Sequence, residues 1–156
     1  MGAFFKRGFS SLKPVIYPPY FNKKSDFKEC LNCETQECVS VCENSIIKFQ
    51  DNRPIIEFNY KGCSFCDKCA EVCELDVLKI ENKKDKLNCE LIINPKKCIA
   101  WNNTICFSCQ DVCIERAIDF SGMFKPIINE ERCTSCGYCV AVCPTNSIEV
   151  IIKGVE

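Results

Sequence analysis

The cysteines are the feature that most constrains what this chain can become. Sixteen of its seventeen cysteines fall into four runs of four, and each run ends in a Cys-x3-Cys step. In chain order, the runs are Cys30, Cys33, Cys38 and Cys42; Cys63, Cys66, Cys69 and Cys73; Cys98, Cys106, Cys109 and Cys113; and Cys133, Cys136, Cys139 and Cys143. The second and fourth runs have the spacing C-x2-C-x2-C-x3-C, which holds cubane iron–sulfur clusters. The chain is therefore expected to bind four 4Fe-4S clusters.

Two other uses of many cysteines are a disulfide framework and zinc sites. Disulfides are disfavoured because the number of cysteines is odd, the thiols are crowded within short loops, and no signal peptide is evident. Zinc sites usually join two C-x2-C pairs across a longer loop and often use histidine, which this chain lacks. Crowded thiolates suit a cubane better, since it presents four separate iron corners.

The runs recur along the chain as an internal repeat. Their first cysteines are 33, 35 and 35 positions apart. Between the runs lie short β-prone segments that flank turn residues. These segments predict hairpins of 46–49 with 55–58, 77–80 with 91–93, and 117–120 with 127–128, and a last strand at 148–152. Short helices are expected at the Cys-x3-Cys steps, for example over 67–72 and 110–114.

These elements predict an α+β fold of tandem bacterial-type two-cluster ferredoxin-like modules. The expected divisions are a basic N-terminal arm over 1–29, a first two-cluster module over 30–94 and a second over 95–156. The arm contains six basic and two acidic side chains. We expect it to be uncleaved and partly flexible.

In two-cluster ferredoxins, the fourth cysteine of a run ligates the other cluster. Pairing the runs in sequence order gives these ligand sets: Cys30, Cys33, Cys38 and Cys73 for cluster 1; Cys63, Cys66, Cys69 and Cys42 for cluster 2; Cys98, Cys106, Cys109 and Cys143 for cluster 3; and Cys133, Cys136, Cys139 and Cys113 for cluster 4. A nested pairing, outer run with outer and inner with inner, is the alternative. Sequential pairing is favoured because the chain between its paired runs is shorter.

Several single residues carry their own expectations. The first and third runs have expanded gaps, and Trp101 in the gap of the third is expected to pack beside cluster 3 rather than dock a partner. Phe65, Phe107 and Tyr138 lie inside cysteine loops, where they would shield clusters from water. Cys89 stands outside every run and is expected to be a buried spectator thiol.

Charge and hydropathy limit the partners and the compartment. The net charge is −1, which implies no affinity for nucleic acid or other polyanions. The segment Lys6-Arg7-Gly8-Phe9 is similar to a twin-arginine signal, but Lys13 and Pro14 interrupt the apolar stretch that export requires. No segment approaches 18 consecutive apolar residues, so no membrane span is expected. These features together predict a cytoplasmic protein.

Taken as a whole, the chain resembles the NapF-type ferredoxins, accessory iron–sulfur proteins of the periplasmic nitrate reductase system. The resemblance rests on the four runs together with the basic arm ahead of Pro18-Pro19. Its most distinctive parts are Cys98-Ile99-Ala100 and Phe107-Ser108-Cys109-Gln110-Asp111, joined by Cys42-Glu43-Asn44 and Cys63-Ser64-Phe65-Cys66. The resemblance implies a cytoplasmic protein that binds the molybdenum-containing catalytic subunit before export. It would load that subunit's iron–sulfur cluster or exchange electrons with it.

The residues themselves support electron transfer and supply no catalytic constellation. The sequence offers no nucleophile with a base and no nucleotide loop, and it has no histidine. The chain is therefore expected to be an electron-transfer or accessory protein, not an enzyme. Three roles stay open: an electron carrier or relay for a redox partner protein, a maturation factor, and an electron-transfer subunit of another anaerobic redox complex.

Overall fold

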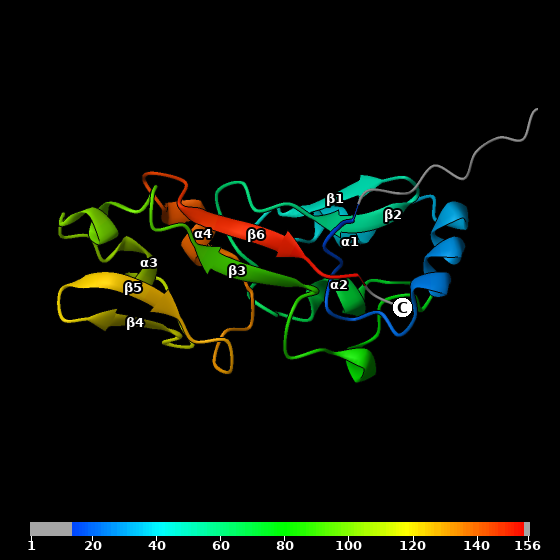
Figure 1. Cartoon of the computed structure of the whole chain (residues 1–156). Coiled ribbons are helices and arrows are strands. Elements are labelled where there is room, and N and C mark those ends of the chain that lie inside the picture. Colours follow the sequence, from blue (N-terminus) through cyan, green and yellow to red (C-terminus); the bar gives the residue numbers. More distant parts are fainter. Residues whose placement is uncertain (1–13, 155–156) are drawn as a thin grey trace, which may run out of the picture.

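The computed structural model describes residues 14–154, and its three small sheets are spread along an elongated molecule (Figure 1). Strand β1 (Ile47–Gln50) pairs with β2 (Arg53–Ile56), and β4 (Ile118–Ser121) pairs with β5 (Phe124–Ile128). These two hairpins lie toward opposite ends of the molecule. Between them, β3 (Cys89–Ile93) pairs with β6 (Ile148–Ile152). All three pairs are antiparallel.

Residues 14–154 also contain seven short helices. The α-helices are α1 (Glu37–Ser40), α2 (Lys68–Glu71), α3 (Ser108–Asp111) and α4 (Tyr138–Val142). The 3-10 helices are η1 (Lys24–Asn32), η2 (Ile80–Asn82) and η3 (Ile99–Asn102). Within residues 14–154, none of these helices has the length and apolar character needed to cross a bilayer.

The two end hairpins are confirmed and have clear local causes. Asp51 and Asn52 both have positive φ, 49° and 57°, as a two-residue turn that matches the twist of a hairpin requires. Gly122 supplies a φ of 67° in the turn between β4 and β5. Each hairpin also contains a proline, Pro54 or Pro126. An edge strand tolerates proline at a position whose N–H would face away from the partner strand.

The predicted hairpin of 77–80 with 91–93 is wrong. Leu91 of β3 instead lies opposite Val150 of β6, while Leu78 forms an isolated bridge with Phe21. The segment 91–93 belongs to strand β3, whereas 77–80 forms no strand beyond the bridge at Leu78. Strand propensity carries no information about which distant segment each one meets. As a result, β3 pairs within the C-terminal half of the chain, although the predicted boundary at 94 placed it in the first module.

The segment that precedes the first cysteine run is part of the core. Tyr17, Tyr20 and Phe21 are each no more than 3% exposed, and the ring of Tyr17 stacks on that of Phe27 at 4.7 Å between centroids. The predicted arm over 1–29 therefore has a packed portion from residue 16 onward, because these aromatic side chains are removed from water. Residues 1–13 of that arm lie outside the described residues.

The two halves of the chain share one plan. In the first half (residues 14–82), an early segment meets a late one through the bridge between Phe21 and Leu78. In the second half (residues 89–152), β3 meets β6 in the same relation. Each half also encloses one hairpin and two of the four α-helices.

Candidate functional site

The four α-helices position the cysteines. Each helix contains the third cysteine of its run, and the fourth cysteine follows one turn later, at i+4. Side chains at i and i+4 lie on one face of a helix, one above the other. A helix this short can therefore reach two neighbouring sites at once.

The sixteen cysteines of the runs line four cavities. The lining cysteines are Cys30, Cys33, Cys38 and Cys73 in cavity 1; Cys42, Cys63, Cys66 and Cys69 in cavity 2; Cys98, Cys106, Cys109 and Cys143 in cavity 3; and Cys113, Cys133, Cys136 and Cys139 in cavity 4. Each cavity combines three cysteines of one run with the fourth cysteine of another run in the same half. These are the sets that sequential pairing of the runs predicts.

The cavities have chemically similar walls. Their volumes range from about 330 to about 400 Å³, including the open space at their mouths. Apart from the thiols, much of the lining is apolar. Ile46 and Ile56 line cavity 2, and Ile93 and Ile148 line cavity 3. A group bound there would be largely shielded from water.

A turn of the same shape follows the fourth cysteine of every run. The residue three positions after that cysteine has a φ between 48° and 56°, and its N–H donates to the carbonyl of the cysteine. The four residues are Ser45, Asp76, Arg116 and Asn146. This turn aims a following backbone N–H at the cysteine sulfur in three of the runs. The donors are Leu78 to Cys73 at 3.4 Å, Ala117 to Cys113 at 3.2 Å and Ser147 to Cys143 at 3.2 Å.

Hydrogen bonds to sulfur favour the thiolate, which is the form that binds metal. The effect is clearest at Cys143, where the Ser147 hydroxyl also lies 3.1 Å from Sγ. Burial acts to raise the pKa of Cys143, but the hydrogen bonds from Ser147 and Thr145 outweigh it and lower that pKa.

Most of the other shifted thiols are held in the neutral form when no cation is near. Burial raises the pKa of Cys30, Cys63 and Cys109 to about 11 and that of Cys38 to about 12. Neighbouring thiolates are a smaller cause that contributes to the same rise in pKa. Such sets of crowded, desolvated thiols become thiolates only when bound cations supply the compensating charge.

The donor sets fit iron–sulfur cubanes better than single ions. Among residues 14–154, no three or more cysteine or acidic side chains converge as ligands of one metal ion do. Four cysteines nevertheless line each cavity. Thiolates spread around a shared space match a group with several metal corners, and cysteine is the ordinary ligand of 4Fe-4S clusters.

Three of the aromatic residues named in the sequence analysis, Trp101, Phe107 and Tyr138, can be placed relative to the cavities and hairpins. Tyr138 lines cavity 4. The ring of Phe107 packs against Phe120, with 4.9 Å between centroids. Trp101 donates from Nε1 to the carbonyl of Pro126 at 3.0 Å, and Pro126 lines cavity 3. Trp101 therefore packs beside cavity 3.

Tyr20 is a site residue that the sequence did not indicate. It is 1% exposed, lines cavity 2, and accepts a hydrogen bond from the N–H of Asp67 at 3.0 Å. Asp67 is the residue before α2 and has a φ of 66°. Its carboxylate is paired with Lys83 at 2.6 Å, and this hydrogen bond lowers the pKa of Asp67. Tyr20 thus fixes the start of the helix that carries Cys69.

Cys89 lies at the start of β3 and is fully buried, as predicted. Its backbone carbonyl accepts a hydrogen bond from the Ser135 hydroxyl at 2.7 Å. Its Sγ lies 3.9 Å from the Ser135 carbonyl oxygen. Cys89 therefore packs behind the loop that joins Cys133 to Cys136.

Comparison with known proteins agrees with this chemistry. Residues 126–149 match the family model of the 4Fe-4S binding domain. The ferredoxin-type protein NapF of Escherichia coli (strain K12) is 32% identical over 139 residues, which cover 85% of this chain and 82% of that protein. The chain belongs to the NapF family of ferredoxin-type proteins. The NapF of Haemophilus influenzae is 33% identical over 140 residues, covering 85% of this chain and 77% of the relative.

Membership of this family fixes the broad class of the molecule. It is a small ferredoxin-like protein of mixed helices and strands that binds iron–sulfur clusters, and proteins of this type carry electrons. A more distant likeness points the same way. The polyferredoxin protein MvhB of Methanothermobacter marburgensis is 30% identical over 96 residues, covering 62% of this chain and 23% of that longer protein.

Proposed function

We propose that this chain is a four-cluster ferredoxin built from two tandem two-cluster modules, and that it serves a cytoplasmic molybdenum enzyme precursor. Each of cavities 1 to 4 would hold one 4Fe-4S cluster through its four cysteines. The observation that carries the proposal is the composition of the cavities, since every one is lined by three cysteines of one run and the fourth of another. The bound clusters would supply one-electron transfer.

The protein's own groups would set how readily each cluster accepts its electron. Adding an electron makes a cluster more negative, so N–H groups aimed at the cysteine sulfurs favour the reduced state. The sulfurs of Cys73, Cys113 and Cys143 each accept such a bond. The Cys143 thiolate would also accept a hydrogen bond from the Ser147 hydroxyl. The apolar walls act in the opposite direction, because a charge in a low-dielectric site is less stable. Cavity 3, which contains Cys143, would therefore hold a comparatively readily reduced cluster.

Iron counting tests both the number of clusters and the crossing of the fourth cysteine. The wild-type chain, reconstituted anaerobically, should bind four iron and four sulfide ions for each of its cavities. The double variant Cys42→Ala, Cys66→Ala should lose one cluster, because both residues line cavity 2. The double variant Cys42→Ala, Cys33→Ala should lose two, because its residues line different cavities. The reverse order of losses would exclude the crossing.

The proposed partner follows from the family resemblance. It is the molybdenum-containing catalytic subunit of periplasmic nitrate reductase, met in the cytoplasm before export. An anaerobic pull-down with the tagged chain should recover the precursor of that subunit. Recovery of a different redox enzyme would instead support an electron-transfer subunit or relay of another anaerobic complex. No substrate site of its own is proposed for the chain.

The basic residues of the N-terminal arm are proposed to contribute to this binding. The truncation that tests them is deletion of residues 1–13, which removes Lys6, Arg7 and Lys13. Deletion of all of 1–29 would also remove Tyr17, Tyr20 and Phe21 from the core. The shorter deletion should weaken co-purification while leaving the iron content intact. Unchanged co-purification would show that these charges are not needed.

Electron transfer and maturation predict different fates for the iron. A carrier keeps its iron through repeated cycles of reduction and oxidation. A maturation factor labelled with ⁵⁷Fe would pass part of that label to the immature catalytic subunit. The expanded loops of the first and third runs make cavities 1 and 3 the proposed sources of any iron that is transferred.

A further inference from the structure

The two halves of the molecule touch through the cysteine loops themselves. The N–H of Cys63 donates to the carbonyl of Cys136 at 2.7 Å. Cys63 lines cavity 2 in the first half, and Cys136 lines cavity 4 in the second. Within residues 14–154, no other backbone hydrogen bond joins cavity-lining cysteines of the two halves. The bond therefore links two of the four sites directly.

Gly62 makes this close approach possible. A Cβ atom at position 62 would lie 2.4 Å from the carbonyl oxygen of Cys136 and 2.5 Å from the backbone nitrogen of Tyr138. Backbone atoms at that distance cannot give way by rotating a side chain. Gly137, on the other side, faces the ring of Phe58, where a Cβ would lie 2.4 Å from two ring carbons. Each half therefore has a glycine where the two loops meet, Gly62 in the first half and Gly137 in the second.

The side chain of Asn44 connects Gly62 of the first half with Tyr138 of the second. Its Nδ2 donates to the carbonyl of Gly62 at 2.8 Å and to the hydroxyl of Tyr138 at 2.9 Å. Asn44 lies two residues after Cys42 of cavity 2, and Tyr138 lines cavity 4. One side chain therefore bridges the same two sites that the Cys63–Cys136 bond joins.

The other neighbouring pairs of sites are linked through helices. Helix α1 carries Cys38 of cavity 1 and leads into Cys42 of cavity 2, and α2 relates Cys69 and Cys73 in the same way. In the second half, α3 and α4 make the corresponding links between cavities 3 and 4. Every cavity touches a hairpin, but cavities 1 and 3 do so near the turns, through Pro54 and Pro126. Cavities 2 and 4 touch the open ends of the hairpins, through Ile56 and Ile128.

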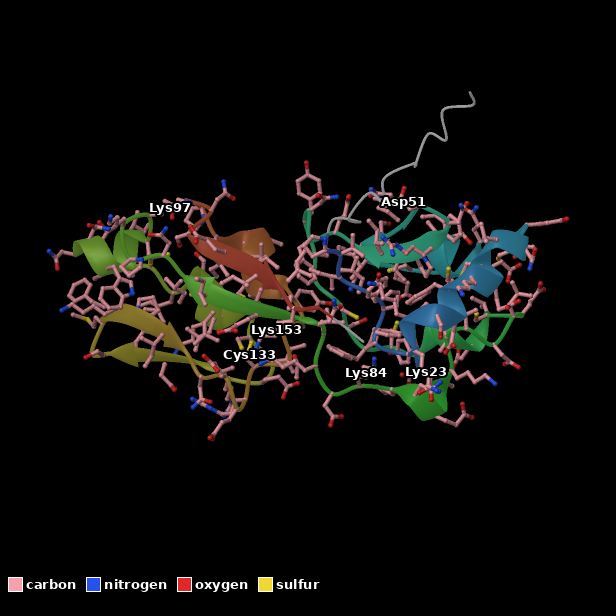
Figure 2. All side chains as sticks on the ribbon, turned by 45° about the vertical axis from the view of Figure 1, so that its right-hand side comes forward. Lys23, Asp51, Lys84, Lys97, Cys133 and Lys153 are labelled. Atoms are coloured by element: carbon pink, nitrogen blue, oxygen red, sulfur yellow. The ribbon has the colours of Figure 1, made fainter. Side chains whose placement is uncertain are left out.

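The figures agree with this order. The two hairpins lie toward opposite ends of the molecule (Figure 1). Figure 2 shows Cys133, a lining residue of cavity 4, in the middle part of the molecule, while Asp51 marks the turn of the β1–β2 hairpin. The sites at the centre are therefore cavities 2 and 4.

We propose that the contact of Cys63 with Cys136, held by Gly62 and Asn44, is the electron-exchange junction between the two halves. The four sites would then act in the spatial order cavity 1, cavity 2, cavity 4, cavity 3. The inference rests on the proposed binding of a cluster in each cavity. One electron would leave a reduced cluster held by Cys63 and enter an oxidised cluster held by Cys136. The first would be oxidised and the second reduced by one charge, with no bond or proton moving.

Magnetic coupling between reduced clusters tests the junction without an activity assay. Replacing two of the four cysteines in a cavity by alanine should empty it. A background with cavities 1 and 3 emptied should, when fully reduced, show an electron paramagnetic resonance spectrum split by interaction between the two remaining clusters. A background with cavities 2 and 4 emptied should show two isolated signals. Stronger coupling in this second background would overturn the proposed order.

Gly62→Ala, made in the first background, tests the contact itself. It should leave iron and sulfide unchanged and reduce the splitting, because the added methyl group forces the two loops apart and the coupling weakens with distance. Gly154→Ala is the matched control, since a Cβ there meets nothing within 4 Å, and it should keep the splitting. An undiminished splitting in Gly62→Ala with full iron content would refute the junction. If Gly62→Ala loses iron, the comparison of the two emptied backgrounds decides instead. Failure of the wild-type chain to bind four clusters would refute the proposed function, a different outcome.

Discussion

Tyr20 offers a sharp test of how the protein would retain the cluster proposed for cavity 2. Its hydroxyl accepts a hydrogen bond from the N–H of Asp67 at 3.0 Å, at the start of the helix that carries Cys69. Tyr20→Phe removes this one bond and keeps the buried ring, so packing around the cavity is preserved. The Asp67 N–H is only partly buried, and water can replace the lost partner in part.

The expected effect follows from that partial burial. An unsatisfied, fully buried donor costs about 1–3 kcal/mol, so a partly buried one should fall at the lower end, near 1 kcal/mol. Local opening of the 63–69 loop should then become about fivefold more frequent, since each 1.4 kcal/mol corresponds to a factor of ten. The initial rate of iron release to a chelator, measured anaerobically, should rise by the same factor. The fast phase should involve one of the four clusters.

Tyr60→Phe is the matched control, because Tyr60 is 91% exposed and its hydroxyl meets solvent. This variant should release iron at the wild-type rate. Two results would refute the reasoning about Tyr20. One is an unchanged release rate in Tyr20→Phe, and the other is equal acceleration for all the bound iron, which would indicate global rather than local opening.

Three further perturbations test other parts of the structure. Cys89→Ala should leave the iron and sulfide content per chain unchanged, because Cys89 lines none of the four cavities. It should lower the free energy of unfolding by about 1 kcal/mol, because a buried sulfur is lost. Loss of a cluster would contradict its role as a spectator. Ser147→Ala removes the hydroxyl 3.1 Å from the Cys143 sulfur and should make the potential of one cluster more negative by about 40 mV, as 1 kcal/mol requires for one electron. A redox titration that showed no shift, or a positive one, would exclude this. Asn88→Ala removes the hydrogen bonds that the Asn88 side chain makes with the backbone groups of Val15, Tyr17 and Lys153. The free energy of unfolding should fall by about 2 kcal/mol, which corresponds to a decrease in Tm of about 4–8 °C for a chain of this size. Calorimetry of the cluster-bound protein under anaerobic conditions measures this change, and an unaltered Tm would count against it.

Much of the site could be predicted because ligand spacing is a local property of the chain. Cys63, Cys66 and Cys69 must lie close together whatever the rest of the fold does, because only two residues separate each from the next. The end hairpins were also accessible, since the turn at Asp51-Asn52 lies directly between two β-prone segments. The pairing of β3 with β6 was not, because Leu91 and Val150 are 59 positions apart and propensity does not identify distant partners.

The supporting residues were hidden for a different reason. Tyr20 carries no motif, and Asn44 stands in the Cys42-Glu43-Asn44 segment without an expected role of its own. Each acts through contacts with remote backbone groups, those of Asp67 and Gly62. The turns after the fourth cysteines were equally hard to see. Their positive-φ positions contain no glycine, although Asn146 and Asp76 belong to the types that tolerate this conformation. The four positions become recognisable only when the runs are aligned on their last cysteine.

The pairing of early with late segments in each half has a consequence during synthesis. Phe21 cannot meet Leu78 until the ribosome has added 57 further residues, Leu78 included, which takes about 3–11 s at 5–20 residues per second. Over that interval, the first two cysteine runs emerge before the segment that closes the half around them. The first half can then close before β6, which must pair with β3, has been made. Cavities 1 and 2 would thus be complete while cavities 3 and 4 were still being assembled, giving the two halves separate periods in which to acquire iron.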